Sequence, residues 1–316
     1  MAKPAVLDLR SPEEYPPLCT MLESMYTYHQ WWKLPQKEVF LAATGPSIRG
    51  IVTNASSSVT RDLVSKLPNL EIVASFSVGV DKVDLHVCKQ NGVVVTNTPD
   101  VLTDAVAETS MALMLTTMRK ICAADRFVRD GGWRGQAFPL TAKISGKRIG
   151  IVGLGRIGAA IARRAEAFDC RIGYWSRSEK KGLSSYKYFG SIVNLAKDSE
   201  VLIVACALTE ETTRIINRKV LDALGPNGYL VNVARGLVVD ERELVQALVE
   251  GRLAGAGLDV FEGEPHVPEE LLHMSNVVLL PHVGTDTWET SGAMANLVIA
   301  NLTAHFSGKP LLTPVS

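Results

Sequence analysis

The stretch Lys147–Phe168, KRIGIVGLGRIGAAIARRAEAF, decides the fold. Its apolar beginning predicts a buried strand and its alanine-rich end predicts a helix, with Gly153, Gly155 and Gly158 between them in G-x-G-x-x-G spacing. In this context the first glycine permits a tight turn, the second lets a pyrophosphate approach the backbone, and the third lets the helix pack on the strand. A strand–turn–helix with glycines by chance is the alternative. The stretch therefore predicts a dinucleotide-binding sheet whose anion lies at the helix start.

The strand that follows this motif ends in an unusual way. An acid that binds the ribose hydroxyls is expected about 20 residues after the glycines. Ser176 stands there instead, followed by Arg177 and Ser178, and then by Lys180 and Lys181. A carboxylate would repel a 2′-phosphate, whereas an arginine between hydroxyls can bind it through charge-assisted hydrogen bonds. The segment predicts a preference for NADPH over NADH; a solvated basic loop, with NADH or dual use, is the alternative.

Short apolar runs alternate with helical patterns on both sides of the motif, beginning with AVLDL, IRGIVTN, EIVASFS and GVVVTNT. This rhythm predicts an α/β fold of two Rossmann-like domains, each a parallel sheet flanked by helices. The segment 103–131 is long enough to connect them. We expect residues 1–100 and 287–316 to form one discontinuous domain, and residues 101–286 to form the dinucleotide-binding domain.

Composition limits the class of protein. A length of 316 residues favours two domains, and a net charge of zero gives no reason to expect a nucleic-acid partner. No run of 18 apolar residues predicts a membrane span. The five cysteines are scattered without a C-x-x-C pair, which favours reduced thiols, and no signal peptide is evident, so we expect a cytoplasmic protein. No metal is expected, because neither H-E-x-x-H nor a Cys/His cluster occurs.

Three later stretches place ionisable residues after expected strands. They are NVARGLVVD with Arg235, GLDVFEGEP with Asp259, Glu262 and Glu264, and PHVGTDTWET with His282. Taken singly, each has an ordinary reading: a surface ion pair, a loop cap, or a histidine bonded within a turn. All three, however, follow strands of the same predicted sheet, whose carboxyl edge is where ligands bind. We therefore expect them to meet in one site.

In this order, and with GLGRIG, these motifs resemble the D-2-hydroxyacid dehydrogenase family over nearly the whole chain. SFSVGVDKVD, the Ser-Arg-Ser segment and the short C-terminus are most similar to its plant cytosolic hydroxypyruvate and hydroxyphenylpyruvate reductases. The resemblance implies reduction of a 2-oxo acid (hydroxypyruvate, glyoxylate or 4-hydroxyphenylpyruvate) to a D-2-hydroxy acid by hydride transfer from NADPH. It also implies that the discontinuous domain binds substrate, and that the protein is a homodimer through the cofactor domain.

The resemblance also implies roles for individual residues. His282 is expected to donate a proton to the keto oxygen, with Glu264 hydrogen-bonded to its ring and Arg235 holding the substrate carboxylate. The backbone amides around Val78 and Gly79 are expected to hold the same carboxylate. The residues expected to contact the cofactor are Gly153, Gly155, Arg156, Ile157, Gly158, Ser176, Arg177, Ser178, Val233, Ala234, Arg235, Asp259, His282 and Gly284.

The chemistry agrees with these roles. Hydride addition builds negative charge on oxygen, so a cationic acid is needed beside it, and a neighbouring carboxylate favours protonated histidine. Trp133 and Phe138 are left open as pocket, dimer contact or interdomain core. A nicotinamide-sensing corepressor of the same fold is the alternative function. A short-chain dehydrogenase is disfavoured, since no tyrosine has a lysine four residues on.

Overall fold

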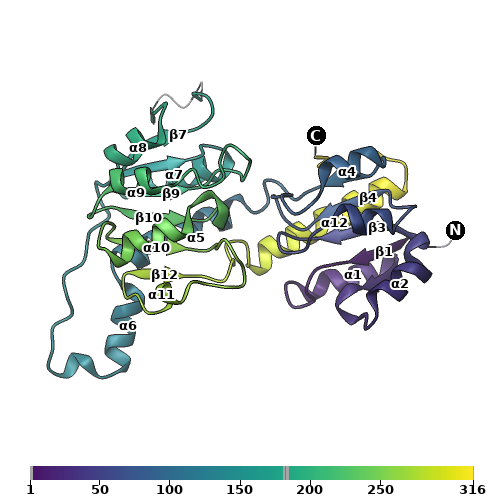
Figure 1. Ribbon diagram of the computed structural model, residues 1–316, viewed down its shortest axis with the longest axis horizontal. Coiled ribbons are helices and arrows are strands. Elements are labelled where there is room, and N and C mark those ends of the chain that lie inside the picture. Colours follow the sequence, from purple (N-terminus) through teal and green to yellow (C-terminus); the bar gives the residue numbers. More distant parts are fainter. Residues whose placement is uncertain (1–2, 181, 183–184, 316) are drawn as a thin grey trace. The chain divides into compact units, whose positions relative to one another are not determined.

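The structure is a computed structural model of the 316-residue chain and describes residues 3–180, 182 and 185–315 (Figure 1). The chain divides into two compact units. Unit 1 comprises Met1–Leu102 and Thr285–Ser316, and unit 2 comprises Thr103–Gly284. Lys181, one of the two lysines considered above, lies outside the described residues.

Unit 1 is built on a five-stranded parallel sheet in the order β2-β1-β3-β4-β5. Its strands are β1 (Ala5–Asp8), β2 (Thr27–Gln30), β3 (Ile48–Thr53), β4 (Ile72–Ser75) and β5 (Val94–Thr96). Its helices are α1 (Pro16–Met25), η1 (Trp31–Lys33), α2 (Lys37–Thr44), η2 (Gly45–Ser47), α3 (Arg61–Ser65), α4 (Leu85–Gln90) and α12 (Trp288–Phe306). The sheet buries nearly continuous apolar runs, as expected for parallel strands covered on both faces.

The end of the chain completes unit 1. Helix α12 packs against β4 and α1. The tail then returns to β5, where Thr96 and Pro314 form an antiparallel bridge and the Val315 amide donates to the Val95 carbonyl at 2.8 Å. The first and last segments of the chain are therefore parts of one folded unit.

Unit 2 contains a seven-stranded parallel sheet in the order β12-β11-β10-β9-β6-β7-β8. Its strands are β6 (Arg148–Val152), β7 (Arg171–Trp175), β8 (Lys187–Tyr188), β9 (Val201–Val204), β10 (Tyr229–Asn232), β11 (Gly255–Leu258) and β12 (Val277–Leu279). Its helices are α5 (Thr103–Met118), α6 (Ile121–Arg129), η3 (Gly132–Arg134), α7 (Arg156–Glu166), α8 (Ile192–Asp198), α9 (Arg218–Leu224), η4 (Gly236–Val238), α10 (Glu241–Val249) and α11 (Glu269–Leu272).

Helices cover both faces of this sheet. Helices α5 and α7 pack on one face, and α8, α9 and α10 bury the large apolar cluster on the other. Strand order reverses between β6 and its neighbour β9, so the loop after β6 opens at the topological switch point where α/β sheets bind ligands. The predicted α/β fold of two parallel sheets flanked by helices is confirmed.

Two local features were not part of the prediction from sequence. The edge strands β2 and β8 were not predicted, because one carries the polar residues TYHQ and the other has only two residues. The long segment 103–131 is not continuous: α5 ends at Met118 and α6 begins at Ile121. Lys120 has φ +51°, a left-handed conformation that interrupts the helix. Within the described residues, no helix has the length and apolar character needed to span a membrane.

Candidate active site

The loop after β6 has the geometry that its glycines require. Gly153 has φ +98°, and a Cβ there would lie 2.6 Å from the Cys206 Cα, so only glycine fits the turn. A Cβ on Gly158 would lie 2.1 Å from the Gly153 carbonyl oxygen, so this glycine lets α7 pack close to the turn. A Cβ on Gly155 would meet no atom within 4 Å, and the residue is exposed at the start of α7. The turn therefore leaves open space at Gly155, where the pyrophosphate of a dinucleotide is expected.

The helix that follows contributes the next expected contacts. Arg156 and Ile157 are the first two residues of α7, and the N-terminus of a helix favours a bound anion. Arg156 is exposed and Ile157 is half-buried. Both thus lie beside the glycine turn, and their contact with a pyrophosphate remains a prediction.

The residues at the end of β7 divide into one buried and two exposed side chains. Ser176 is buried, and its hydroxyl donates to the Ser178 carbonyl at 2.6 Å. Arg177 and Ser178 are exposed. Ser176 thus shapes the turn, while Arg177 and Ser178 remain accessible for a phosphate. Lys180 is also exposed, and its amide is tied to the Tyr174 hydroxyl at 2.9 Å.

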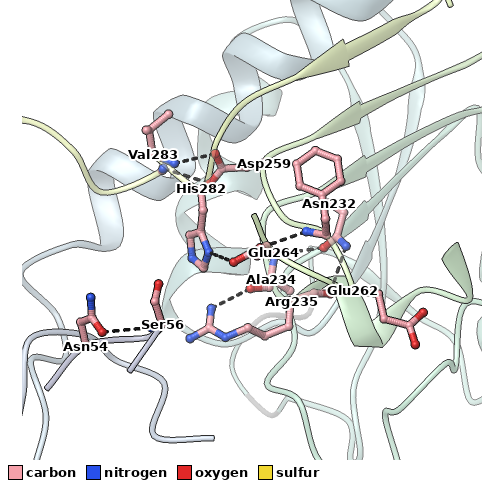
Figure 2. A network of polar contacts seen from close by, with 12 residues as sticks. Asn54, Ser56, Asn232, Ala234, Arg235, Asp259, Glu262, Glu264, His282 and Val283 are labelled. Carbon is pink, nitrogen blue, oxygen red and sulfur yellow. Dashed lines mark hydrogen bonds and ion pairs between the residues drawn. The ribbon is translucent and has the colours of Figure 1, made fainter. Parts of the chain in front are cut away.

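Arg235 is presented by a short loop after β10 (Figure 2). The buried Asn232 holds this loop: its Oδ1 accepts from the Ala234 amide at 3.0 Å, and its Nδ2 donates to the Arg235 carbonyl at 3.1 Å. Arg235 Nη1 donates to the Ala234 carbonyl at 2.8 Å. Val233 and Ala234 are buried in the same turn. The loop is therefore fixed at both ends of its guanidinium-bearing residue.

The backbone that carries His282 is anchored to Asp259 (Figure 2). Asp259 follows β11 and is buried, and its two carboxylate oxygens accept from the Val283 amide at 2.8 Å and the Gly284 amide at 2.9 Å. A Cβ on Gly284 would lie 2.7 Å from Asp259 Oδ2, so glycine is needed for this approach. His282 itself has φ +58°, which is uncommon for a residue with a side chain. The hydrogen bonds from the Val283 and Gly284 amides to Asp259 hold His282 in that conformation.

His282 and Glu264 form the central pair of the site. Nδ1 of the imidazole lies 2.8 Å from Glu264 Oε2, and the other carboxylate oxygen, Oε1, accepts from the Phe261 amide at 2.9 Å (Figure 2). Burial lowers the pKa of His282, but the hydrogen bond and charge of Glu264 raise it by more, so the net shift is upward. Burial likewise raises the pKa of Glu264, and its bonds to His282 and Phe261 outweigh this and lower it. Both shifts favour a protonated imidazole beside an ionised carboxylate.

These side chains come from three adjacent strands. Arg235 follows β10, Asp259 and Glu264 follow β11, and His282 follows β12, which are neighbours in the sheet. The charges of Arg235, which lowers the pKa of His282, and of Asp259, which raises it, both act on the ring. The structure thus brings together the three stretches that the sequence singled out.

Val78 and Gly79 belong to unit 1 and follow β4. The Val78 carbonyl accepts from Asn97 Nδ2 at 2.8 Å, and the Gly79 carbonyl accepts from the Ser77 hydroxyl at 2.6 Å. Their carbonyl groups are therefore held by side chains of unit 1, and Val78 is exposed. The loop is a fixed structure whose role with substrate remains a prediction.

Trp133 and Phe138 lie in the segment after α6. Trp133 is 73% exposed, and Phe138 packs edge-on against Phe127 with ring centroids 5.5 Å apart. The described residues contain no group of three or more His, Cys, Asp or Glu side chains placed to hold a metal ion.

Sequence reasoning missed Asn232, although a signal for it was present. An asparagine at the end of an otherwise apolar strand is buried only when its amide is hydrogen-bonded, and Asn232 opens the NVARG motif. The sequence holds no comparable signal for Glu241 and Arg214, because the residue that both contact, Glu262, is distant from them in sequence.

Comparisons with known proteins match most of the chain to the family that its motifs resemble. Residues 111–284 match the D-isomer specific 2-hydroxyacid dehydrogenase family, NAD binding domain. The hydroxyphenylpyruvate reductase of Plectranthus scutellarioides is 59% identical over 294 residues, covering 93% of this chain and 94% of the relative. A glyoxylate/hydroxypyruvate reductase A of Arabidopsis thaliana is 57% identical, with the same coverage of 93% and 94%.

A solved structure shares the whole fold. The NADPH-dependent glyoxylate/hydroxypyruvate reductase of Sinorhizobium meliloti, in complex with NADP and malonate, superposes with a TM-score of 0.93 at 42% identity, covering 100% of this chain and 97% of that chain. The resemblance read from the motifs is confirmed, and the chain belongs to the D-isomer specific 2-hydroxyacid dehydrogenase family of oxidoreductases.

Proposed function

We propose that this chain reduces small 2-oxo acids to D-2-hydroxy acids with NADPH. The observation that carries the proposal is the His282–Glu264 pair, with 2.8 Å between Nδ1 and Oε2, at the carboxyl end of a sheet that also presents Arg235. Bound reduced nicotinamide cofactor supplies the hydride. The relatives named above as hydroxyphenylpyruvate and glyoxylate/hydroxypyruvate reductases support hydroxypyruvate, glyoxylate and 4-hydroxyphenylpyruvate as candidate substrates.

Each residue has a distinct task in the proposed reaction. His282 donates the proton from Nε2 to the keto oxygen as negative charge develops there, while Glu264 holds Nδ1 and keeps the ring charged. Arg235 binds the substrate carboxylate through its planar guanidinium, whose paired donors match the two carboxylate oxygens. The backbone amides of Val78 and Gly79, in unit 1, are further proposed substrate contacts.

We further propose that Arg177 and Ser178 select NADPH by binding its 2′-phosphate. Both are exposed at the end of β7, and the Sinorhizobium meliloti relative is NADPH-dependent. The remaining proposed cofactor contacts are Gly153, Gly155, Arg156, Ile157, Gly158, Ser176, Val233, Ala234, Arg235, Asp259, His282 and Gly284.

The test is the initial rate of cofactor oxidation with hydroxypyruvate, using NADPH and NADH side by side, in the wild type and in Arg177→Ala. We expect the wild type to prefer NADPH. Loss of a charge-assisted hydrogen bond costs about 1.5–3 kcal/mol, so Arg177→Ala should raise KM for NADPH about 10-fold or more and leave KM for NADH nearly unchanged. Arg171→Ala, at the opposite end of β7, is the control. Equal losses with both cofactors would refute the phosphate role, and no oxidation of either cofactor with any of the three candidate acids would refute the proposed reaction.

We also propose that the protein is a homodimer through an arm, defined as residues 121–143, that carries exposed apolar side chains. Figure 1 shows α6 and the segment after it extending away from the sheet of unit 2. Helix α6 has no buried residue, and Trp133 and Leu140 in the arm are 73% and 99% exposed. Exposed apolar side chains of this kind are typical of an interaction surface, and the family resemblance supports a second copy of the chain as its occupant.

The oligomer proposal predicts a change in mass. By light scattering, wild-type protein should have twice the mass of one chain, and Leu140→Glu should shift it toward one chain because a charge would be buried at the interface. Val249→Glu, a change of another exposed apolar residue of unit 2, should stay dimeric. A wild-type protein with the mass of one chain would rule the dimer out.

The proposed location is the cytoplasm. All five cysteines are free thiols, as expected in a reducing compartment. Microscopy of the fluorescently tagged chain tests this, and an organellar signal would contradict it.

A further inference from the structure

The loop that leads to Glu264 is held by a carboxylate from another helix. Glu241, the first residue of α10, accepts a hydrogen bond at its Oε2 from the Glu262 amide at 2.9 Å. The preceding amide, that of Phe261, is held by Glu264 itself at 2.9 Å. Two consecutive amides of this loop therefore donate hydrogen bonds to two different carboxylates. Of these two, the carboxylate of Glu264 contacts His282.

A second anchor reaches the same loop from the segment before α9. The Arg214 guanidinium forms an ion pair with Glu262. The Arg214 amide also donates to the Leu237 carbonyl at 2.7 Å, in the turn that follows Arg235. Arg214 has φ +50°, so its backbone adopts a left-handed conformation to make both contacts. One residue thus connects the loop of Arg235 to the loop of Glu264.

The two loops also touch through their backbones. A Cβ on Gly236 would lie 1.9 Å from the Phe261 carbonyl carbon, so glycine is required there. Phe261 is buried in the apolar core of unit 2 and gives the loop a rigid base. Beyond Phe261, Glu262 is held by Glu241 and Arg214. They lie two residues before Glu264, where a small shift would move its carboxylate away from His282.

The ion pair contributes little to overall stability. The Arg214 side chain is 54% exposed, so water screens the attraction between the two charges. Its geometric effect is larger, because a displacement of about 1 Å at a reacting group can cost about 100-fold in rate. The bond from the Glu262 amide to Glu241 is a charge-assisted hydrogen bond to a half-buried carboxylate, which is stronger than a neutral one.

We propose that Glu241 and Arg214 are positioning residues, which hold loop 261–264 so that Glu264 stays within hydrogen-bond distance of His282. The inference rests on the proposed function of His282 as proton donor. Neither side chain is assigned a contact with substrate or cofactor.

A loosened loop changes the charge environment of His282. The charged groups that act on the ring are Glu264, Arg235 and Asp259. When Glu264 moves away, burial and Arg235 continue to lower the pKa of His282, and only Asp259 continues to raise it. The pKa of His282 then falls. Because reduction needs the protonated ring, the fall in kcat/KM with rising pH should begin at lower pH. Glu241 itself is surrounded by Glu262, His266 and Glu264.

The experiment compares Glu241→Ala with Glu241→Gln. The alanine variant loses the acceptor, so we expect kcat/KM to fall about 10-fold, the falling limb of the pH profile to move to lower pH, and cofactor KM to stay the same. The glutamine variant keeps an amide oxygen for the Glu262 amide and should recover most of the wild-type rate. Glu243→Ala, two residues further along α10, is the control.

A second readout does not depend on turnover. The pKa of His282 is measured by NMR titration of its ring signals in the absence of substrate, with the signal identified from a His282→Asn spectrum. Glu241→Ala should lower that pKa, and Arg214→Gln should lower it in the same direction, which covers the case in which one variant fails to fold. A wild-type pKa in a folded Glu241→Ala or Arg214→Gln variant would overturn the inference, as would a glutamine variant as impaired as alanine. If wild type proves inactive on 2-oxo acids, the titration still decides whether the loop is held this way.

Discussion

Replacement of His282 by alanine is expected to lower kcat about 10²–10⁴-fold, the contribution of a positioned general acid. The reason is the pair with Glu264, which occupies Nδ1 at 2.8 Å and raises the pKa of the imidazole despite its burial. The variant loses both the proton and the positive charge beside the developing alkoxide. Cofactor binding should be largely kept, since His282 is one of many proposed cofactor contacts and the glycine turn after β6 is unaffected. Steady-state kinetics and a fluorescence titration with NADPH measure the two quantities separately.

The matched control is another histidine–glutamate pair. His273 lies 3.1 Å from Glu269 on α11, and both side chains are largely exposed. His273→Ala should therefore leave kcat within about twofold, as expected for a surface substitution.

The raised pKa of His282 also predicts the direction of the pH dependence. The wild-type rate of reduction should be high below that pKa and fall as pH rises through it. A His282→Ala enzyme with near wild-type turnover would exclude the residue as proton donor.

Replacement of Arg235 by lysine is the second large effect. Lysine keeps the charge but loses the planar pair of donors that matches a carboxylate. Loss of one charge-assisted hydrogen bond costs about 1.5–3 kcal/mol, so kcat/KM for the 2-oxo acid should fall about 10- to 100-fold, mainly through a higher substrate KM. The loop should keep its shape, because Asn232 holds the backbone on both sides of Arg235. Steady-state kinetics with hydroxypyruvate at saturating NADPH measure the change.

A control for Arg235 lies on a nearby helix. Arg242 is exposed on α10, and Arg242→Lys should not alter substrate KM. An Arg235→Lys enzyme with wild-type substrate KM would show that the guanidinium does not bind the carboxylate. A raised cofactor KM with unchanged substrate KM would instead assign Arg235 to the cofactor.

The parts of the fold that could be predicted from sequence are those with local causes. The strand, turn and helix around Gly153 follow from glycine geometry and apolar periodicity over one short stretch, and the structure reproduces all three. The edge strands β2 and β8 lack an apolar run, so they depend on pairing with a neighbouring strand rather than on their own residues. The break between α5 and α6 at Lys120 could not be predicted, because no glycine or proline stands there.

The site could be predicted only as far as strand order allows. Arg235, Asp259 and His282 follow strands that are neighbours in the sheet, so an argument from strand ends brings them together. The contacts that orient them depend on loop shape. Glu241 and Arg214 contact a loop that is distant in sequence, and Arg214 meets Glu262 across 48 positions. No periodicity or spacing encodes such a contact.

The return of the chain to unit 1 has a consequence for how the protein is made. Unit 1 needs α12 and the tail that pairs with β5, and these segments leave the ribosome after all of unit 2. All of unit 2 precedes these segments in the sequence. Its sheet can therefore form while unit 1 still lacks one of its packed helices. Domains usually fold in the order in which they are synthesised. Here the inserted unit can fold first, and a nascent chain cut before α12 should carry a folded cofactor unit attached to an unfinished N-terminal one.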